Sequence, residues 1–197
     1  MPHAIFVETD LDGGVAAYAA ELPGCAVFAA GDDAATSTMP RRVSEFTAWL
    51  RAQGEETARF VGDNWYEVER APATAGRRAS FSLDELPPSD AEFAAWLRWL
   101  ELAREELADA LDHATGDQVA SVAAIERQDV AFARELGGQA ASLDGDPIDR
   151  LYAARDALTE ALAAAGPSAD GVRRILRLAI ADDLRAAATL RGHESAA

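Results

Sequence analysis

Apolar and polar residues alternate along roughly the first thirty positions of the chain, a pattern typical of β-strands. The alternation predicts three short strands, at residues 3–8, 15–22 and 25–29. Gly13-Gly14 and Pro23-Gly24 lie between these segments and favour tight turns. The pattern therefore indicates a three-stranded meander at the N-terminus.

The spacing of apolar residues becomes helical after the third strand. The predicted helix begins at Asp32 or Asp33 and ends near Gln53. Its apolar residues share one face, at Val43, Phe46, Trp49 and Leu50. Pro40 lies inside this window, and because proline has no backbone N–H we expect the helix to begin late or to kink there.

Two more strands are predicted after this helix, at Ala58–Val61 and Trp65–Glu69, with a turn between them. Residues 71–88 are rich in small residues, glycine and proline, and Pro87-Pro88 forbids a helix across that point. We therefore predict a linker at 71–88, with the domain boundary near 71–86.

From Ser89 onward the period is helical throughout. Ser89 and Glu92 form a capping box, in which each side chain caps the other residue's backbone N–H. Four helices are predicted, at about 90–113, 118–136, 147–165 and 169–190. Modest loops between helices of this length indicate an antiparallel four-helix bundle over residues 89–192, followed by a tail at 193–197.

The predicted fold class is therefore α+β: a small β-β-β-α-β domain over residues 1–70, then the helical bundle. Composition agrees with a folded protein, since 49% of the 197 residues are hydrophobic and 26% are charged. The formal net charge is −16, so we expect no nucleic-acid partner, because affinity for phosphate backbones comes from Lys and Arg. All 18 basic residues are arginine, which excludes catalysis by a lysine nucleophile.

Location is predicted from three further features. The apolar runs are too short for a transmembrane helix, so we expect no membrane partner. The first residues lack the basic and apolar regions of a signal peptide. Cys25 is the single cysteine and cannot form an internal disulfide, which suits a reducing compartment. Together they predict a cytoplasmic protein.

The N-terminal residues resemble a known family. Asp12-Gly13-Gly14, followed by Glu21-Leu22-Pro23-Gly24-Cys25 and a helix ending near Trp49-Leu50, is similar to the HicB-like fold of type II toxin–antitoxin antitoxins. The resemblance covers about residues 3–70. It implies a small α/β domain that contacts a partner protein, which in the antitoxins is a ribonuclease toxin.

The C-terminal half resembles the DinB-like four-helix bundles, a group that includes metal-dependent thiol transferases. The resemblance rests on residues 121–136 and 172–190. It implies a divalent metal held by one histidine on the second helix and a His-x-x-x-His pair on the fourth. This chain has Ala124, Asp182 and Ala186 at those positions, and its histidines are His3, His113 and His193. We therefore expect the histidine metal site to be lost.

Four carboxylates remain near those positions. The apolar stripes place Asp129 on the inward face of the second helix and Asp182 on that of the fourth, with Glu126 and Asp183 beside them. Inward carboxylates must be protonated, paired or metal-bound. One interpretation is a site for Mg, Mn or Ca, because these cations prefer oxygen ligands. The other, which we prefer, is that these acids pair with arginines such as those at 127, 155, 177 or 185, or lie at the solvated rim.

These observations leave three functional hypotheses. The leading one is a non-catalytic binding or interaction protein with no cofactor, which forms a homodimer and contacts a protein partner through the HicB-like domain. The second is a divalent-metal-dependent transferase or hydrolase that uses the four carboxylates. The third is an antitoxin that binds a toxin ribonuclease.

Overall fold

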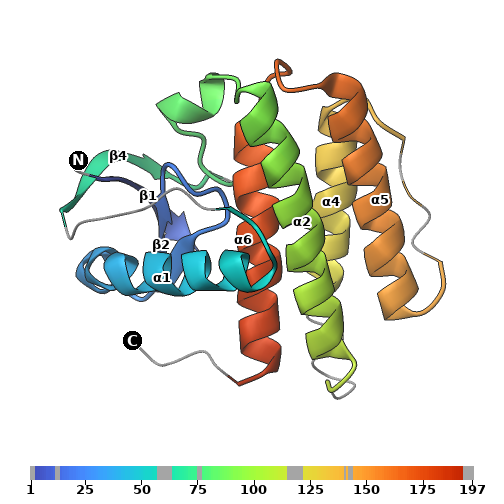
Figure 1. The fold of residues 1–197 in the computed structure, drawn as a ribbon, viewed down its shortest axis with the longest axis horizontal. Helices are drawn as coiled ribbons and strands as arrows, with labels where there is room; N and C mark the ends of the chain where they lie inside the picture. Colours follow the sequence, from blue (N-terminus) through green and yellow to red (C-terminus); the bar gives the residue numbers. More distant parts are fainter. Residues whose placement is uncertain are drawn as a thin grey trace. The chain divides into compact units, whose positions relative to one another are not determined.

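A computed structural model describes residues 3–11, 14–56, 64–74, 77–114, 122–139, 141 and 144–192. The chain divides into two compact units, with the division between Leu86 and Pro87. The first unit is a four-stranded mixed sheet with one long helix, and the described part of the second is helical (Figure 1). The fold is therefore α+β.

The sheet of the first unit has the strand order β3-β2-β1-β4. The bounds of the strands are β1 His3–Leu11, β2 Gly14–Ala19, β3 Ala26–Ala29 and β4 Trp65–Pro72. The first three strands pair antiparallel, which confirms the predicted meander, and β4 joins β1 in parallel. A Cβ at Gly14 would overlap the carbonyl oxygen of Ala29, which explains why glycine stands there. The strand predicted at 58–61 lies outside the described residues.

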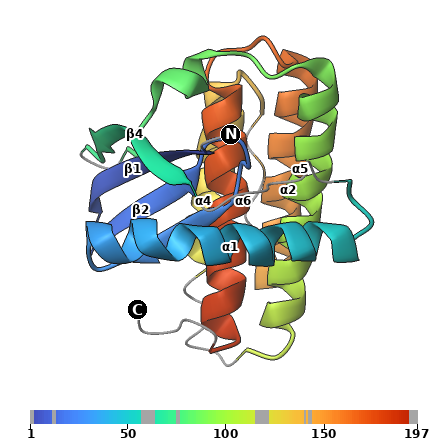
Figure 2. The same ribbon diagram turned by 60° about the vertical axis from the view of Figure 1, so that its left-hand side comes forward.

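One long helix, α1 (Asp32–Ala52), packs on one face of the sheet, mainly against β2 and β3 (Figure 2). Its buried face includes Val43, Phe46 and Leu50, as the periodicity predicts, whereas Trp49, predicted on the same face, is only half-buried. The helix continues through Pro40 and does not begin late. Proline removes only the N–H that would reach the carbonyl of Thr36, and the packed face holds the remaining turns.

Residues 77–86 cover the opposite face of the sheet, and this corrects the predicted linker. The Phe81 ring stacks on that of Phe6, with ring centroids 4.6 Å apart. The backbone N–H of Ala79 donates a 2.6 Å hydrogen bond to Glu8 of β1. A short 3-10 helix, η1 (Ser82–Glu85), completes this segment. Small and polar composition suggested a linker, yet two apolar side chains and one buried backbone bond hold the segment in the first unit.

The described helices of the second unit number four. Their bounds are α2 Asp90–Leu111, α4 Ala123–Glu135, α5 Pro147–Ala165 and α6 Val172–Leu190. The predicted capping box begins α2, where the Glu92 N–H donates to the Ser89 hydroxyl and the Glu92 carboxylate accepts from the Ser89 N–H. Asp146 caps α5 ahead of Pro147. The structure does not describe residues 115–121, so the start of the helix predicted at 118–136 lies outside the described ranges.

The helices do not alternate in direction as an antiparallel bundle requires. Helix α2 packs beside α6, and α4 beside α5 (Figure 1). Contacts from α2 to α6 advance in the same order on both helices, from Arg173 over the Trp96 ring to Arg104 with Asp183, so this pair is parallel. The pair α4 and α5 is parallel as well.

The connection between α4 and α5 is long enough to permit the parallel pair. Eleven residues, 136–146, separate Glu135 from Pro147. At up to about 3.3 Å per extended residue they reach farther than the roughly 20 Å length of the 13-residue helix α4. The chain therefore has enough length to return to the starting end before α5 begins.

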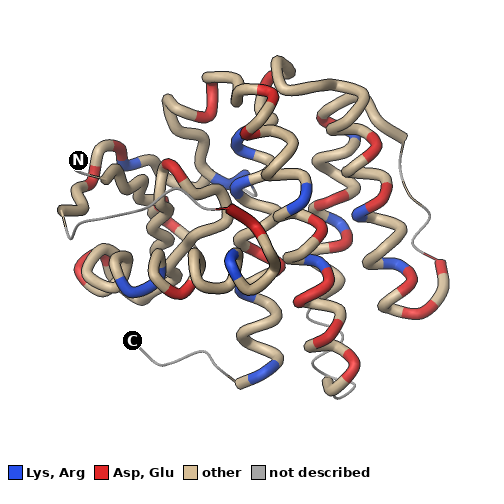
Figure 3. The backbone as a smooth tube through the Cα atoms, viewed as in Figure 1, with Lys and Arg blue, Asp and Glu red and all other residues tan. Residues whose placement is uncertain are grey.

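Acidic residues are spread over both units, interspersed with arginines (Figure 3). Within the described residues, no helix is both long and apolar enough to cross a bilayer.

Candidate functional site

Four charged side chains meet in the interior of the second unit, one from each described helix. Arg104 comes from α2, Asp129 from α4, Arg155 from α5 and Asp183 from α6. Each is at most 3% exposed. We call this cluster the Arg–Asp ring, because each arginine contacts both aspartates and each aspartate contacts both arginines.

The four edges of the ring are short. Arg104 Nη2 lies 2.7 Å from Asp129 Oδ2 and 3.0 Å from Asp183 Oδ1. Arg155 Nη2 lies 2.7 Å from Asp183 Oδ2, and Arg155 Nε lies 3.1 Å from Asp129 Oδ2. Arg104 also donates to Asp183 Oδ2 and to the backbone carbonyl of Leu151. Its guanidinium nitrogens are thus all engaged.

The ring carries two positive and two negative charges, so it is neutral as a whole. Burial raises the pKa of the Asp129 carboxyl, while the guanidiniums of Arg155 and Arg104 act against that shift. Burial, and then repulsion from Arg104, lowers the pKa of Arg155. Asp129 Oδ1 and Arg155 Nη1 have no hydrogen-bond partner among the described residues. The ring is therefore a desolvated ion-pair network whose charges offset each other.

The structure supports ion pairing at the predicted carboxylates, with different partners from those expected. Asp129 is buried as predicted, and Arg155, one of the four candidate arginines, contacts it. Glu126 is buried and pairs with Arg150, at 3.2 Å, which was not among the candidates. Arg104 was missed altogether.

The prediction that Asp182 faces inward is wrong, because the inward residue is Asp183. Asp183 is fully buried, whereas Asp182 is half-buried and accepts a 2.8 Å hydrogen bond from the Gln128 amide. The buried positions of α6 include 172, 176, 179, 180, 183 and 187. The stripe expected from sequence was therefore out of phase by one residue at its second half.

The DinB-like resemblance assigns histidine ligands to three positions, and this chain has no histidine at any of them. Ala124 lies on α4, with Asp182 and Ala186 on α6. His3 lies in β1 and contacts Glu21 at 3.0 Å, His113 follows the end of α2, and His193 is outside the described residues. Across the described ranges no group of three or more His, Cys, Asp or Glu side chains is placed to hold a metal ion.

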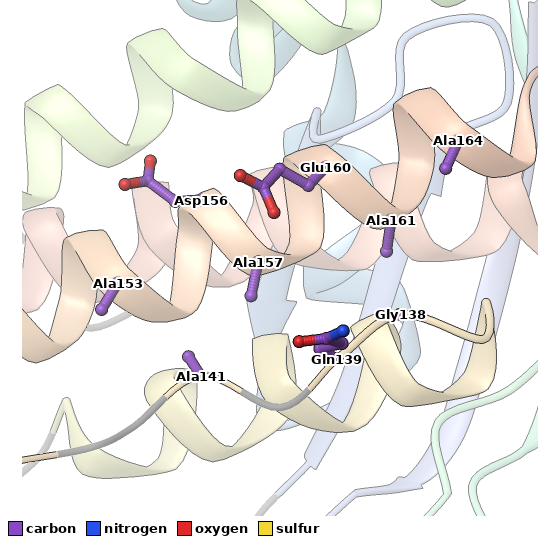
Figure 4. A pocket seen from close by; sticks show the side chains of 9 residues that line it. All are labelled: Gly138, Gln139, Ala141, Ala153, Asp156, Ala157, Glu160, Ala161 and Ala164. Carbon is purple, nitrogen blue, oxygen red and sulfur yellow. The ribbon is translucent and has the colours of Figure 1, made fainter.

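A groove of about 610 Å³ lies beside α5 in the second unit (Figure 4). Its wall on α5 consists mainly of alanines, and Ala157 and Ala161 point toward the segment at Gly138 and Gln139. Asp156 and Glu160 project from α5 away from that segment. A Cβ at Gly138 would lie 2.6 Å from the Ala161 Cβ, so glycine permits this close approach. The groove presents methyl groups, the Gln139 amide and the carboxylates of Asp156 and Glu160 to a ligand.

The first unit has its own buried polar cluster, around Glu8 of β1. Its carboxylate, which is fully buried, accepts hydrogen bonds from the Tyr18 hydroxyl at 2.7 Å and from Arg78 Nε at 3.0 Å. The Ala79 N–H supplies a further donor. This carboxylate therefore joins β1 and β2 to the covering segment at 77–86.

The single thiol is placed for packing. Cys25 is fully buried, and desolvation raises its pKa to about 12. A thiol with so high a pKa carries almost no thiolate at neutral pH, which is the form that reacts.

Comparisons of the chain with protein-family models, with curated proteins and with solved structures found no match.

Proposed function

We propose that this chain is a binding or interaction protein of the cytoplasm, with a HicB-like unit that contacts a protein partner and a DinB-like helical unit that is a non-catalytic scaffold. The Arg–Asp ring carries the proposal. It occupies the interior of the helices where the sequence placed the candidate carboxylates, and its two aspartates are matched by two arginines.

The charge balance explains why this interior is unsuited to a divalent cation. A metal ion bound between Asp129 and Asp183 would lie within a few ångströms of two guanidiniums that already contact those oxygens. Binding would require the arginines to leave, and their charges would then be buried without partners. Removing one partner of a buried pair costs about 3–5 kcal/mol.

The interaction part of the proposal rests on the edge of the sheet. Strand β4 is the last strand beside β1, so one row of its backbone groups faces away from the sheet. Tyr66 and Val68 of this strand are 47% and 44% exposed. An edge strand with exposed apolar side chains favours pairing with another chain. We propose a homodimer paired through this edge as the resting state, which a protein partner displaces when it binds.

Thermal unfolding of the chelator-treated full chain tests the scaffold. The panel contains Mn, Ni, Zn, Mg and Ca, each with the wild type, with Asp129→Asn and with the matched control Asp182→Asn. A metal that binds the native state at a hundredfold over its Kd adds about 2.7 kcal/mol of stability. We expect no shift that depends on Asp129. A shift in the wild type and in the control that disappears in Asp129→Asn would establish a carboxylate metal site and overturn the proposal.

Light scattering over a range of concentrations tests the dimer. We expect a mass of twice the 20.9 kDa of the chain, falling toward that value on dilution. A constant mass of one chain at every concentration would refute the homodimer.

A further inference from the structure

A groove of about 580 Å³ lies in the first unit between α1 and the start of β4. Asp33, Thr36 and Pro40 line it from α1, and Trp65 and Glu67 from β4. Trp65 and Glu67 are two positions apart on a strand, so both side chains point to the α1 side of the sheet. Ile5, which is opposite Glu67 in the β1–β4 register, forms the floor.

The carboxylates of Asp33 and Glu67 line this groove, and the Thr36 and Ser37 hydroxyls that line it already donate to backbone carbonyls of α1. The Asp33 carboxylate has no hydrogen-bond or ionic partner among the described residues. The carbonyl of Thr36 lacks its usual helical donor, because Pro40 has no N–H to offer it. A ligand that donates hydrogen bonds, and carries positive charge, complements this set.

An arginine of the same unit shows that the carboxylates here can bind a guanidinium. Arg70 donates from Nε to Glu67 Oε1 at 2.9 Å and also contacts Asp32. A β-bulge between the residues opposite Ile5 and Phe6 brings Glu67 and Arg70 to the same face of β4. With Asp32, Asp33 and Glu67 against Arg70, this corner of the unit keeps two uncompensated negative charges.

The apolar wall suits the stem of a long basic side chain. The Trp65 ring is stacked against the His3 ring, with centroids 4.6 Å apart, so its orientation is fixed. Pro40 forms the facing wall on α1. Arginine and lysine carry three or four methylenes that pack on such surfaces while the cation reaches acceptors, and a cation also interacts favourably with an indole face.

We propose that this groove takes an arginine or lysine side chain of a protein partner whose extended backbone lies along the free edge of β4. Backbone hydrogen bonds to the edge supply affinity, and the acidic groove selects the basic residue. Tyr66 and Val68, next to the groove residues on the strand, contact the same segment. The inference rests on the proposed interaction role of the first unit.

Binding of labelled, blocked octapeptides to the full chain tests this inference. In one peptide arginine alternates with valine, in a second lysine replaces arginine, and in a third glutamine does. We expect the two basic peptides to bind roughly five- to tenfold more tightly than the glutamine peptide at low ionic strength, and to lose that advantage in high salt. Equal binding of all three peptides, or binding of none, would overturn the inference.

A pair of double variants localises the effect. Asp33→Asn with Glu67→Gln should remove the preference for the basic peptides. Glu45→Gln with Glu56→Gln removes the same charge from exposed positions of the same unit and should keep the preference. Equal losses in both would show a response to net charge alone and refute a groove.

Hydrogen exchange of residues 65–70 separates the occupants of the edge. We expect the arginine peptide to slow exchange there. If protein concentration alone slows it and the peptide adds nothing, a second copy of the chain occupies β4, and the groove inference is wrong while the proposed dimer stands. If light scattering shows no dimer but the peptides keep their order of affinity, the proposed dimer is wrong and the groove inference stands.

Discussion

Replacing Asp183 by asparagine is the sharpest perturbation of the helical unit. The amide keeps the size of the side chain and removes its charge, so the two buried arginines would share Asp129 alone. Asp183 accepts three hydrogen bonds from those arginines, at 2.7, 3.0 and 3.1 Å. Because an uncompensated buried charge remains, we expect a loss of about 3–5 kcal/mol of unfolding free energy.

Urea unfolding followed by far-ultraviolet circular dichroism measures this loss, because the described helices of the second unit contribute strongly to the signal. Asp182→Asn is the matched control, one residue away on the same helix and only half-buried. Because an asparagine oxygen can still accept from the Gln128 amide, the loss in this control should stay below about 1.5 kcal/mol, the lower value for a hydrogen bond to a charged group. Native stabilities are about 5–15 kcal/mol, so the difference between the variants is easily resolved.

A paired replacement distinguishes lost charge balance from lost packing. Arg104→Met with Asp183→Leu removes one charge of each sign and leaves Asp129 with Arg155. Apolar replacement of a buried ion pair is often neutral or stabilising. The double variant should therefore be at least about 2 kcal/mol more stable than Asp183→Asn. If Asp183→Asn loses no more than Asp182→Asn, or the double variant is the least stable, charge balance does not hold this interior together.

Three further outcomes are expected. Cys25, with its pKa raised to about 12, should resist iodoacetamide at pH 8 in the native protein and react fully in urea, as mass spectrometry would show. Ser89→Ala should lower stability by about 1 kcal/mol at neutral pH in urea titrations. The Ser89 hydroxyl and N–H lower the pKa of Glu92 below its ordinary 4.5. The stability that this capping box contributes is therefore present above pH 4.5 and lost as the pH falls through the lowered pKa. A stability difference between Ser89→Ala and the wild type that grows in acid would contradict this. Arg78→Leu should cost about 2 kcal/mol by leaving the buried Glu8 without its cation, and Glu8→Gln in the same chain should recover part of it.

Local patterns predicted most of the secondary structure. The meander, the long helix after it and the capping box at Ser89 are confirmed, since turn glycines, apolar periodicity and cap residues act over a few positions. Residues 77–86 were misassigned because Phe81 and Arg78 find their partners on distant strands. The parallel pairing of α4 with α5 is not predicted either, because the connection of residues 136–146 is long enough for α5 to run in either direction.

The ring was partly visible in the sequence, in the gaps of the apolar stripes. On α2 the buried leucines at 100 and 107 flank only Ala103 and Arg104 at inward positions, and on α5 those at 151 and 158 flank only Ala154 and Arg155. A charged residue in the gap of a stripe, once on each of several helices, predicts a shared buried network. The sequence analysis names Arg155 as a candidate partner but not Arg104, and the error of one residue on α6 gives the inward position to Asp182 instead of Asp183.

The alternation of charge in the ring has a consequence for how the helices assemble. Along the chain the four helices contribute arginine, aspartate, arginine and aspartate in turn. Any three of them together bury an odd charge, and the first three to leave the ribosome would enclose two guanidiniums with a single carboxylate. Helix α6 closes the electrostatic balance as well as the packing. We therefore expect that a chain truncated before α6 does not fold its remaining helices into a smaller bundle, and that it folds only when α6 is added.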